Sequence, residues 1–354
     1  MPFWNSILLS LVALLLVTGC SDTDREAAST RFMVMGTLVD IAIWGEDKET
    51  AEKGFHLVEQ TMHEINATWH AWRPSLLTRI NQSLANDRSI SVTSQQLSLI
   101  RRAKDLSVIT NGYFDPATGA LSLLWGFQQD DLPTGPPPDE KAIKAILSSY
   151  ASIRDLDIHG NTISTLNKNI RLDFGAFAKG YAVDLAMEKL KQVGIRNAII
   201  NAGGDLRAIG THGHRPWRIG VRDPRNPGKG NLNGGGILAA IETRQDESVF
   251  TSGDYERYYI YQGKRYHHIL DPRTGYPSRD FTSVTVIYDN ATDADALATA
   301  LMVAGKAHWR TVANAMHAQS VMLIDHDNHV ILTPTMQKRV RFLKQVSKPE
   351  IIAP

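Results

Sequence analysis

The sequence predicts an α+β fold in which mostly antiparallel sheets are flanked by helices. Apolar residues at helical spacing come early in the chain, whereas short strand-like segments dominate from about residue 197 onward. No internal repeat is evident, and no Gly-x-Gly-x-x-Gly or Walker loop follows a strand. Helices and strands that are segregated in this way are typical of α+β proteins, whereas regular alternation would favour a doubly wound parallel sheet.

The N-terminal segment has the properties of a lipoprotein signal peptide. Residues 1–19 carry no charged side chain, and residues 7–17 are almost wholly apolar, a run too short to span a bilayer but typical of a secretion signal. Thr18 and Gly19 are small and precede Cys20, the only cysteine of the chain. We therefore expect cleavage before Cys20 and its lipidation. An ordinary secretion signal is the alternative, since the segment lacks Lys and Arg; either interpretation places the mature protein outside the cytoplasm.

Composition indicates a folded protein without affinity for nucleic acid. Hydrophobic residues make up 43% and charged residues 21% of the chain, so a sizeable core can form. The formal net charge of +1 gives no electrostatic reason to expect nucleic-acid binding. A single cysteine excludes an intramolecular disulfide. Residues 20–30 are small and polar and are expected to form a flexible tether, after which the chain is long enough for one large or two modest domains.

Apolar periodicity predicts the individual elements in order. A β-rich segment over 31–44 is followed by a helix over 49–69, and a second helix begins at a Ser94 N-cap and stops at Asn111-Gly112. The Pro- and Gly-rich residues 133–138 are expected to form a loop. The remaining expected elements are a helix over 176–193, strands over 197–200, 217–221, 237–242, 255–261 and 282–288, a helix over 292–303 that stops at Gly305, and a closing hairpin of 320–324 with 329–332.

Residues 172–184 form the first pattern with chemical potential. A strand is expected to end at Asp173 and a helix to begin near Ala176, with small residues that let a ligand approach the backbone. Free N–H groups at a helix N-terminus attract phosphate oxygens, and Lys179 adds a positive charge one turn later. The alternative is a plain turn with Asp173 as a cap, which composition alone favours.

Three further patterns are rich in turn-forming residues. The segment Asn-Ala-Gly-Gly-Asp at 201–205 reads most simply as a hairpin turn between two strands. Asp-Pro-x-Thr-Gly occurs at 115–119 and again at 271–275, and both copies favour turns. Tyr113 and Phe114 directly precede the first copy and are equally suited to a core.

Two patterns suggest acid–base or metal chemistry. His267 and His268 are paired ahead of the second Asp-Pro-x-Thr-Gly turn, although such histidines more often only hydrogen-bond within the structure. Asp295 and Thr299 lie four residues apart and therefore on one face of a helix. Their oxygen donors suit Mg²⁺ far better than Zn²⁺. Capping of that helix by residues 292–293 is the simpler alternative.

Taken together and in this order, the patterns resemble the ApbE family of FAD:protein FMN transferases. The resemblance runs from about residue 32 to about residue 332, nearly all of the expected mature chain. Its most specific parts are Leu-Asp-Phe-Gly-x-x-Ala-Lys-Gly-Tyr, Asn-Ala-Gly-Gly-Asp, His-Ile-Leu-Asp-Pro-Arg-Thr-Gly and Asp-Ala-Leu-Ala-Thr-Ala-Leu, with Met-Gly-Thr at 35–37. The resemblance implies a single ApbE-type domain over 31–338 and a C-terminal tail over 339–354.

The resemblance also implies a role for particular residues. His268 would be the acid–base residue beside the phosphates, and lipidation at Cys20 is common in the family. Mg²⁺ would be held by the backbone carbonyl of Ala176 together with Asp295 and Thr299. The residues implied to contact FAD are Met35, Trp72, Tyr113, Phe114, Asp115, Asp173, Lys179 and Ile269.

The implied reaction is Mg²⁺-dependent transfer of the FMN half of FAD to a Thr or Ser hydroxyl of another protein, with release of AMP. Acceptors would be flavoprotein subunits of membrane redox complexes or other extracytoplasmic flavoproteins. The implied location is the bacterial cell envelope, with the protein anchored by lipid and facing the periplasm. Alternatives are an FAD pyrophosphatase that uses water at the same site, a non-catalytic FAD-binding lipoprotein, and a structural lipoprotein that binds neither FAD nor Mg²⁺.

Overall fold

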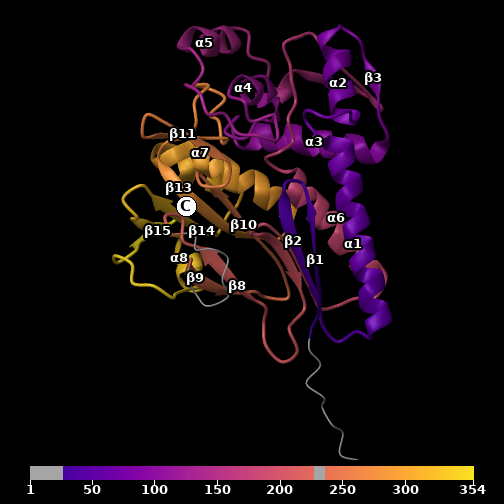
Figure 1. Cartoon of the computed structure of the whole chain (residues 1–354), viewed down its shortest axis with the longest axis vertical. Coiled ribbons are helices and arrows are strands. Elements are labelled where there is room, and N and C mark those ends of the chain that lie inside the picture. The colour runs from indigo at the N-terminus through magenta and orange to yellow at the C-terminus, as the bar shows by residue number, and fades with distance from the viewer. Residues whose placement is uncertain (1–26, 227–235) are drawn as a thin grey trace, which may run out of the picture.

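A computed structural model describes residues 27–226 and 236–354, so the predicted signal segment and Cys20 lie outside the described residues. Within these residues, a nine-stranded sheet forms the centre of the molecule, in the order β1-β2-β6-β7-β10-β13-β14-β15-β17 (Figure 1). Neighbouring strands are antiparallel except for the last pair, β15 and β17. The strands are β1 Ala28–Val34, β2 Thr37–Ile43, β6 Ala198–Ala202, β7 Asp205–Ile209, β10 Asp246–Gly253, β13 Phe281–Tyr288, β14 Ser320–Asp325, β15 Val330–Leu332 and β17 Glu350–Ile351.

Helices cover one face of this sheet and a second, smaller sheet covers the other. Figure 1 shows α1 and α6 side by side, and α7 lying across β10 and β13. The three-stranded sheet β16-β9-β8 encloses a separate apolar cluster with β7, β10, β14 and β15. The helices are α1 Lys48–Trp69, α2 Leu76–Ala85, α3 Ser94–Ile109, α4 Gly119–Leu124, α5 Glu140–Ser148, α6 Ala178–Gln192, α7 Ala291–Ala315 and α8 Pro334–Gln337, with 3₁₀ turns Pro116–Thr118 and Ile153–Asp155.

A third region, at the top of Figure 1, joins helices from the first half of the chain to a hairpin from the second half. α4 and α5 pack on the hairpin β11-β12 through a cluster that includes Leu121, Trp125 and Tyr259. A small sheet β3-β5-β4 completes the region. The remaining strands are β3 Ile90–Ser91, β4 Leu156–His159, β5 Thr162–Thr165, β8 Arg218–Arg222, β9 Ile237–Glu242, β11 Tyr258–Tyr261, β12 Lys264–His267 and β16 Val340–Phe342.

The predicted α+β class with mostly antiparallel sheets is confirmed. The expected hairpin at 201–205 is also present, because Gly203 and Gly204 adopt φ angles of 74° and 112° between β6 and β7. Positive φ at both central residues is the geometry that the tightest hairpin turns require. The turn between β1 and β2 has the same character at Met35 and Gly36, with φ of 53° and 72°.

The first residue of α3 is Ser94, as predicted, but the predicted N-cap of α3 and the predicted start of α6 were wrong. The N-cap of α3 is Thr93, not Ser94: Thr93 Oγ1 accepts from the Gln96 N–H at 3.2 Å, and the Gln96 side chain accepts from the Thr93 N–H at 2.9 Å. α6 begins at Ala178, not Ala176, and the expected strand ending at Asp173 is not formed, because residues 171–174 belong to no strand. A tight turn comes first, in which the Ala178 N–H donates to the carbonyl of Phe174 at 2.8 Å.

The expected helix stop at Gly305 is a break and not an end. Gly305 has φ 63° and ψ −171°, outside the helical region, and the chain then resumes a helix to Ala315. Asp280 caps the start of this second helical segment, because its carboxylate accepts a hydrogen bond from the backbone N–H of Lys306 at 2.7 Å.

Several elements were not predicted from the sequence. The short helix α4 and the strands β3, β4, β5 and β12 are too short to display a period, whereas α2 and α5 are amphipathic and were overlooked. Residues of the expected C-terminal tail join the sheets at two points, since β16 pairs with β9 and β17 pairs with β15. The first strand begins at Ala28, inside the expected tether. Among the described residues, no helix combines the length and apolar character needed to cross a membrane.

Candidate active site

The N-terminal turns of α6 and α7 meet backbone to backbone. A Cβ atom on Gly180 would lie 2.1 Å from the carbonyl oxygen of Ala291, so only glycine permits this approach. The Gly180 N–H donates to Asp295 Oδ2 at 3.0 Å. Gly180 is the third residue of α6, and its N–H is one of the first-turn donors that have no acceptor within the helix. The carbonyl of Ala176, just before the helix, has no hydrogen-bond partner within the described part of the chain.

Asp184, one turn after Gly180 on α6, holds the start of α7 in place. Its carboxylate accepts from the N–H groups of Ala291 and Thr292, both at 2.8 Å, and from Thr292 Oγ1 at 2.6 Å. A carboxylate at a helix N-terminus also interacts favourably with the helix dipole. Arg207 donates to the same carboxylate at 2.8 Å and so orients it.

The predicted alternative, that residues 292–293 cap this helix, is wrong. Asn290 is the N-cap, because its side chain accepts from the Asp293 N–H at 2.8 Å. Asp293 instead pairs with Arg102 of α3 through two contacts of 2.8 and 2.5 Å. Asp293 is therefore engaged in an ion pair between helices, and Asp295 is the carboxylate that faces α6.

Charged groups converge around Asp295. Asp295 is only 5% exposed. Burial raises the pKa of its carboxyl group, the positive charge of Lys179 lowers this pKa, and the negative charge of Asp205 raises it. Lys179 forms an ion pair with Asp205. Burial alone would lower the pKa of Lys179, but the carboxylates of Asp205 and Asp295 outweigh burial and raise it. Lys179 therefore stays cationic, and Asp205 is held in turn by the Thr251 N–H at 3.0 Å.

The predicted metal ligands fit Mg²⁺. Asp295 is a buried carboxylate whose hydrogen bonding within the described residues consists of the single N–H of Gly180. Thr299 lies one turn later on α7 and its hydroxyl is 3.2 Å from Ser252 Oγ. Residues 27–226 and 236–354 contain no cluster of three or more His, Cys, Asp or Glu side chains arranged for a metal. One carboxylate with a hydroxyl and a free carbonyl is instead the kind of site that Mg²⁺ completes with substrate phosphates.

His268 is held in one tautomer by the backbone of Arg257. The Arg257 carbonyl accepts a hydrogen bond from the backbone N–H of His268 at 3.0 Å, and the ring nitrogen Nδ1 of His268 lies 3.2 Å from the same oxygen. Since a carbonyl only accepts, Nδ1 carries the proton and the lone pair is on Nε2. Burial, followed by the neighbouring His267, Lys179 and Arg257, lowers the pKa of His268 to about 3. His267 has a structural role, because its Nε2 contacts the Ser278 carbonyl at 2.8 Å.

The Arg257 side chain links His268 to Trp72. Its guanidinium donates to the carbonyls of Phe127 and Gln129 at 3.3 and 2.8 Å, and it lies 5.8 Å from the centroid of the Trp72 ring. The Phe127 ring is 6.4 Å from that of His268. Trp72 Nε1 is buried without a hydrogen-bond partner among the described residues, so a ligand at this wall would find a donor.

Asp173 is placed by two segments of the chain. Its carboxylate accepts from Gln128 Nε2 at 2.8 Å and from the Gly175 N–H at 2.9 Å, while its own N–H donates to the carbonyl of Pro116 at 2.7 Å. The first Asp-Pro-x-Thr-Gly segment therefore runs beside the turn that leads into α6. The bond to Gly175 is local, as expected for a turn residue.

Residues 113–115 have structural partners. Phe114 is 1% exposed and packs edge-on against Phe177, as the core interpretation expected. Asp115 accepts from Ser152 Oγ at 2.6 Å and from the N–H groups of Ala117 and Ile153, both at 3.0 Å. Tyr113 lies under the guanidinium of Arg273 at 4.1 Å. Contact of these three residues with FAD stays a prediction.

Ile269 belongs to the same large apolar cluster as Tyr113 and Phe114, and Met35 packs against that cluster, but both have different backbone surroundings. Met35 is in the β1–β2 turn, which touches the β6–β7 turn because the Gly203 N–H donates to the Leu38 carbonyl at 3.0 Å. Ile269 is buried, and its carbonyl accepts from the Ser278 N–H at 3.0 Å. Both residues are implied FAD contacts that the structure leaves as predictions.

Sequence reasoning assigned no individual role to four residues that organise the site, namely Gly180, Asp184, Asp205 and Arg257, although the first three lie within the patterns at 172–184 and 201–205. Asp184 could have been noticed, because it follows Gly180 by four residues and so shares its helical face. Asp205 begins a strand whose five residues are all buried, a place where a carboxylate needs partners, and Lys179 and the Thr251 N–H supply them. Arg257 carries no comparable signal, since its role depends on partners from other elements.

Comparison with known proteins identifies the family. Residues 35–323 match the ApbE family. The chain is 37% identical over 312 residues to an FAD:protein FMN transferase of Rhodobacter capsulatus, covering 88% of this chain but only 58% of that protein. It is 32% identical over 327 residues to an FAD:protein FMN transferase of Vibrio cholerae, covering 91% and 94% of the two chains. The chain therefore spans little more than half of the first relative and nearly all of the second.

Solved structures agree with these sequence matches. The crystal structure of an ApbE protein from Thermotoga maritima superposes with a TM-score of 0.79 at 31% identity, covering 89% of this chain and all of that one. The flavin transferase ApbE from Vibrio cholerae superposes with a TM-score of 0.74 at 29% identity, covering 89% and 99%. The similarity extends over the helices and strands that carry the candidate site.

Proposed function

Because this chain belongs to the ApbE family, we propose that it transfers the FMN half of FAD to a Thr or Ser hydroxyl of another protein and releases AMP. The proposal is supported by the names of the relatives and by a site in which a cationic lysine lies beside a buried carboxylate that can hold a metal cation. Lys179 is cationic, and next to it lies the buried Asp295. Stabilisation of charge on the transferring phosphoryl group is the main requirement of such a reaction.

The arrangement of Asp295, Gly180 and Ala176 carries the proposal. Among the described residues, the Asp295 carboxylate accepts only the Gly180 N–H and the Ala176 carbonyl accepts no hydrogen bond, so both keep bonding capacity near the junction of α6 and α7. We infer that Ala176, Asp295 and Thr299 hold Mg²⁺, which when bound would neutralise phosphate oxygens of FAD. A protein that only stored FAD would have no need for a cation site at this position.

The proposed reaction forms one bond to phosphorus, breaks another and moves one proton. The acceptor hydroxyl oxygen forms a bond to the phosphorus on the riboflavin side, and the bond from that phosphorus to the oxygen of the AMP phosphate breaks. AMP leaves with the electron pair of the broken bond. His268 accepts the hydroxyl proton at Nε2, the nitrogen that its contact with the Arg257 carbonyl leaves unprotonated. Approach of phosphate charge raises the basicity of this imidazole.

Intact mass spectrometry of an acceptor tests the proposal. Protein lacking residues 1–20 retains every described residue and would be incubated with FAD, Mg²⁺ and a flavoprotein domain that offers a Thr or Ser. An acceptor heavier by one FMN, with AMP formed only when the acceptor is present, is the expected result. AMP and free FMN without acceptor modification would instead identify an FAD pyrophosphatase. Bound FAD with neither product would identify a carrier.

We further propose that the protein works in the cell envelope, anchored through a lipid on Cys20 and facing the periplasm. Support comes from the apolar N-terminal segment with small residues before the single cysteine. The acceptors would then be flavoprotein subunits of membrane redox complexes or other extracytoplasmic flavoproteins.

A further inference from the structure

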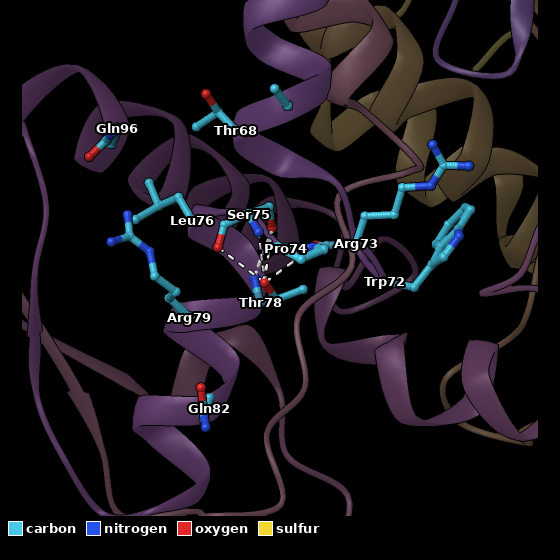
Figure 2. Close-up of a pocket in the computed structure, with 11 residues that line it drawn as sticks. Thr68, Trp72, Arg73, Pro74, Ser75, Leu76, Thr78, Arg79, Gln82 and Gln96 are labelled. Carbon is cyan, nitrogen blue, oxygen red and sulfur yellow. Dashed lines mark hydrogen bonds between the residues drawn. The ribbon is translucent and has the colours of Figure 1, made fainter.

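A groove of about 810 Å³ opens beside Trp72, between the end of α1, the start of α2 and the start of α3. Figure 2 shows Trp72 and Arg73 on one side of the Pro74–Ser75 turn, and Arg79 with Gln96 on the other. The volume lies within the range of about 300–1,000 Å³ that ligand-binding sites occupy. Its polar lining includes Thr68, Gln82 and Gln96.

Trp72 connects this groove to the candidate active site. The Trp72 ring lines the groove and also lies 5.8 Å from the guanidinium of Arg257, whose carbonyl holds His268. A polypeptide that lay in the groove would therefore lead toward the proposed proton acceptor. The proposed contacts with the FAD phosphates lie elsewhere, around Lys179 and Asp295.

The groove is cationic and has no acidic side chain in its lining. The Arg79 side chain forms neither an ion pair nor a hydrogen bond in the part of the chain that the structure describes. Arg73 forms an ion pair with Asp130 at 2.7 Å, and the two side chains are 60% and 68% exposed. Exposed pairs of this kind contribute little free energy, so Arg73 can exchange its partner. Gln96 uses its carbonyl oxygen to cap α3, which leaves its amide N–H groups as donors.

We infer that this groove receives an extended segment of the acceptor polypeptide and that Arg79 binds an acidic side chain near the modified Thr or Ser. The inference rests on the proposed transferase function and specifies the chemistry of its protein substrate. A guanidinium binds a carboxylate through paired N–H groups, and a groove without acidic side chains selects for such a partner. The amides and hydroxyls of the lining suit the backbone of an extended chain.

The test compares Arg79→Gln with Arg88→Gln. Arg88 is exposed just beyond the other end of α2, lies outside the groove and likewise has no side-chain partner among the described residues. We expect Arg79→Gln to lower kcat/KM for the acceptor by roughly 2- to 5-fold through a higher KM, the effect of losing one solvent-exposed ion pair. The dissociation constant of FAD should be unchanged, and Arg88→Gln should match the wild type in both measurements.

Direct binding separates this inference from the transferase proposal. Fluorescein-labelled hexaglutamate should bind the wild type and Arg88→Gln, but bind Arg79→Gln more weakly, as read by fluorescence anisotropy. Equal binding by all three proteins, or equal acceptor KM values, would overturn the inference even if FMN transfer occurs. A weaker affinity for FAD in Arg79→Gln would also overturn it, by assigning the groove to the nucleotide. Absence of FMN transfer by the wild type would contradict the transferase proposal. The hexaglutamate measurement would then still show whether the groove binds an acidic peptide through Arg79.

Discussion

The backbone N–H of Gly180, an unpaired donor of the first turn of α6, donates to the Asp295 carboxylate of α7 at 3.0 Å. One hydrogen bond thus links α6 to α7 and orients the carboxylate of Asp295. The bond is possible because Gly180 lets the two backbones touch. The proposed metal site therefore depends on a residue that is not itself a ligand.

Gly180→Ala should destabilise the protein and impair metal-dependent turnover together. The added Cβ would meet the Ala291 carbonyl oxygen at 2.1 Å and Thr292 Cα at 2.9 Å, and backbone atoms cannot move aside without shifting α7. We expect a loss of about 1–3 kcal/mol in the free energy of unfolding, measured by denaturant titration. Gly135→Ala is the control, because its Cβ would meet nothing within 4 Å. Equal stability of both variants would contradict the proposed contact.

Asp295→Asn should abolish the response to Mg²⁺ while leaving the fold intact. Asn retains an oxygen that can accept from the Gly180 N–H but removes the charge. Because even residues that only support a ligand are worth about 10–100-fold in metal affinity, we expect turnover to fall by more than about 100-fold. Asp293→Asn on the same helix should keep its dependence on Mg²⁺, since Asp293 pairs with Arg102. Activity, and melting temperature with and without Mg²⁺, decide the assignment; an unchanged Mg²⁺ response in Asp295→Asn would refute it.

His268→Ala should slow transfer by roughly 10²–10⁴-fold and leave FAD affinity largely in place, as expected for loss of a general base. A loss of FAD affinity with normal turnover would show that His268 binds FAD and does not accept the proton. Stopped-flow transfer assays and an FAD titration measure the two effects separately.

The pH dependence of the free enzyme should lack an inflection near the ordinary histidine pKa. Burial lowers the pKa of His268 to about 3, below its value of about 6.5 in an unfolded chain. Protonation therefore favours the unfolded state, so the stability associated with His268 is present above about pH 6.5 and declines as the pH falls toward 3. We expect kcat/KM to show no His268-dependent limb between pH 5 and 8. A limb near pH 6.5 that disappears in His268→Ala would contradict the burial of this imidazole.

Arg257→Lys should lower kcat more than it raises the KM for FAD. A lysine cannot reproduce the two bonds to the Phe127 and Gln129 carbonyls, so the backbone that holds His268 Nδ1 loses its anchor. ¹⁵N chemical shifts of the His268 ring report its tautomer directly. A single Nδ1–H tautomer in the wild type and a mixture in the variant are expected, whereas identical spectra would remove the positioning role.

Cys20→Ser should release the protein from membranes. The proposed anchor is a lipid on this single cysteine, which lies outside the described residues. Ser21→Ala, one residue later, is a matched control that keeps the attachment site. Fractionation with incorporation of labelled fatty acid gives the answer, and a Cys20→Ser protein that stays with the membrane would point to another anchor.

Much of the fold could be predicted because it depends on local sequence. The helical spacing over 49–69 identified α1, and the two glycines at 203–204 identified the β6–β7 turn, since each signal involves residues close in the chain. The same periodicity placed Asp295 and Thr299 on one face of α7. Short elements such as α4 and β3 escaped prediction because a few residues cannot display a period.

The sequence by itself therefore determined the fold class, most long elements and the residue types of the candidate site. Only the tertiary structure decided how those residues are used. Gly180 and Asp295 are separated by 115 residues, and Asp184 and Thr292 by 108, yet each pair forms a hydrogen bond. Such contacts follow from the packing of α6 on α7, and close packing depends on the shape of both surfaces at once. Local sequence specifies each helix, but only the assembled core specifies which backbone groups meet.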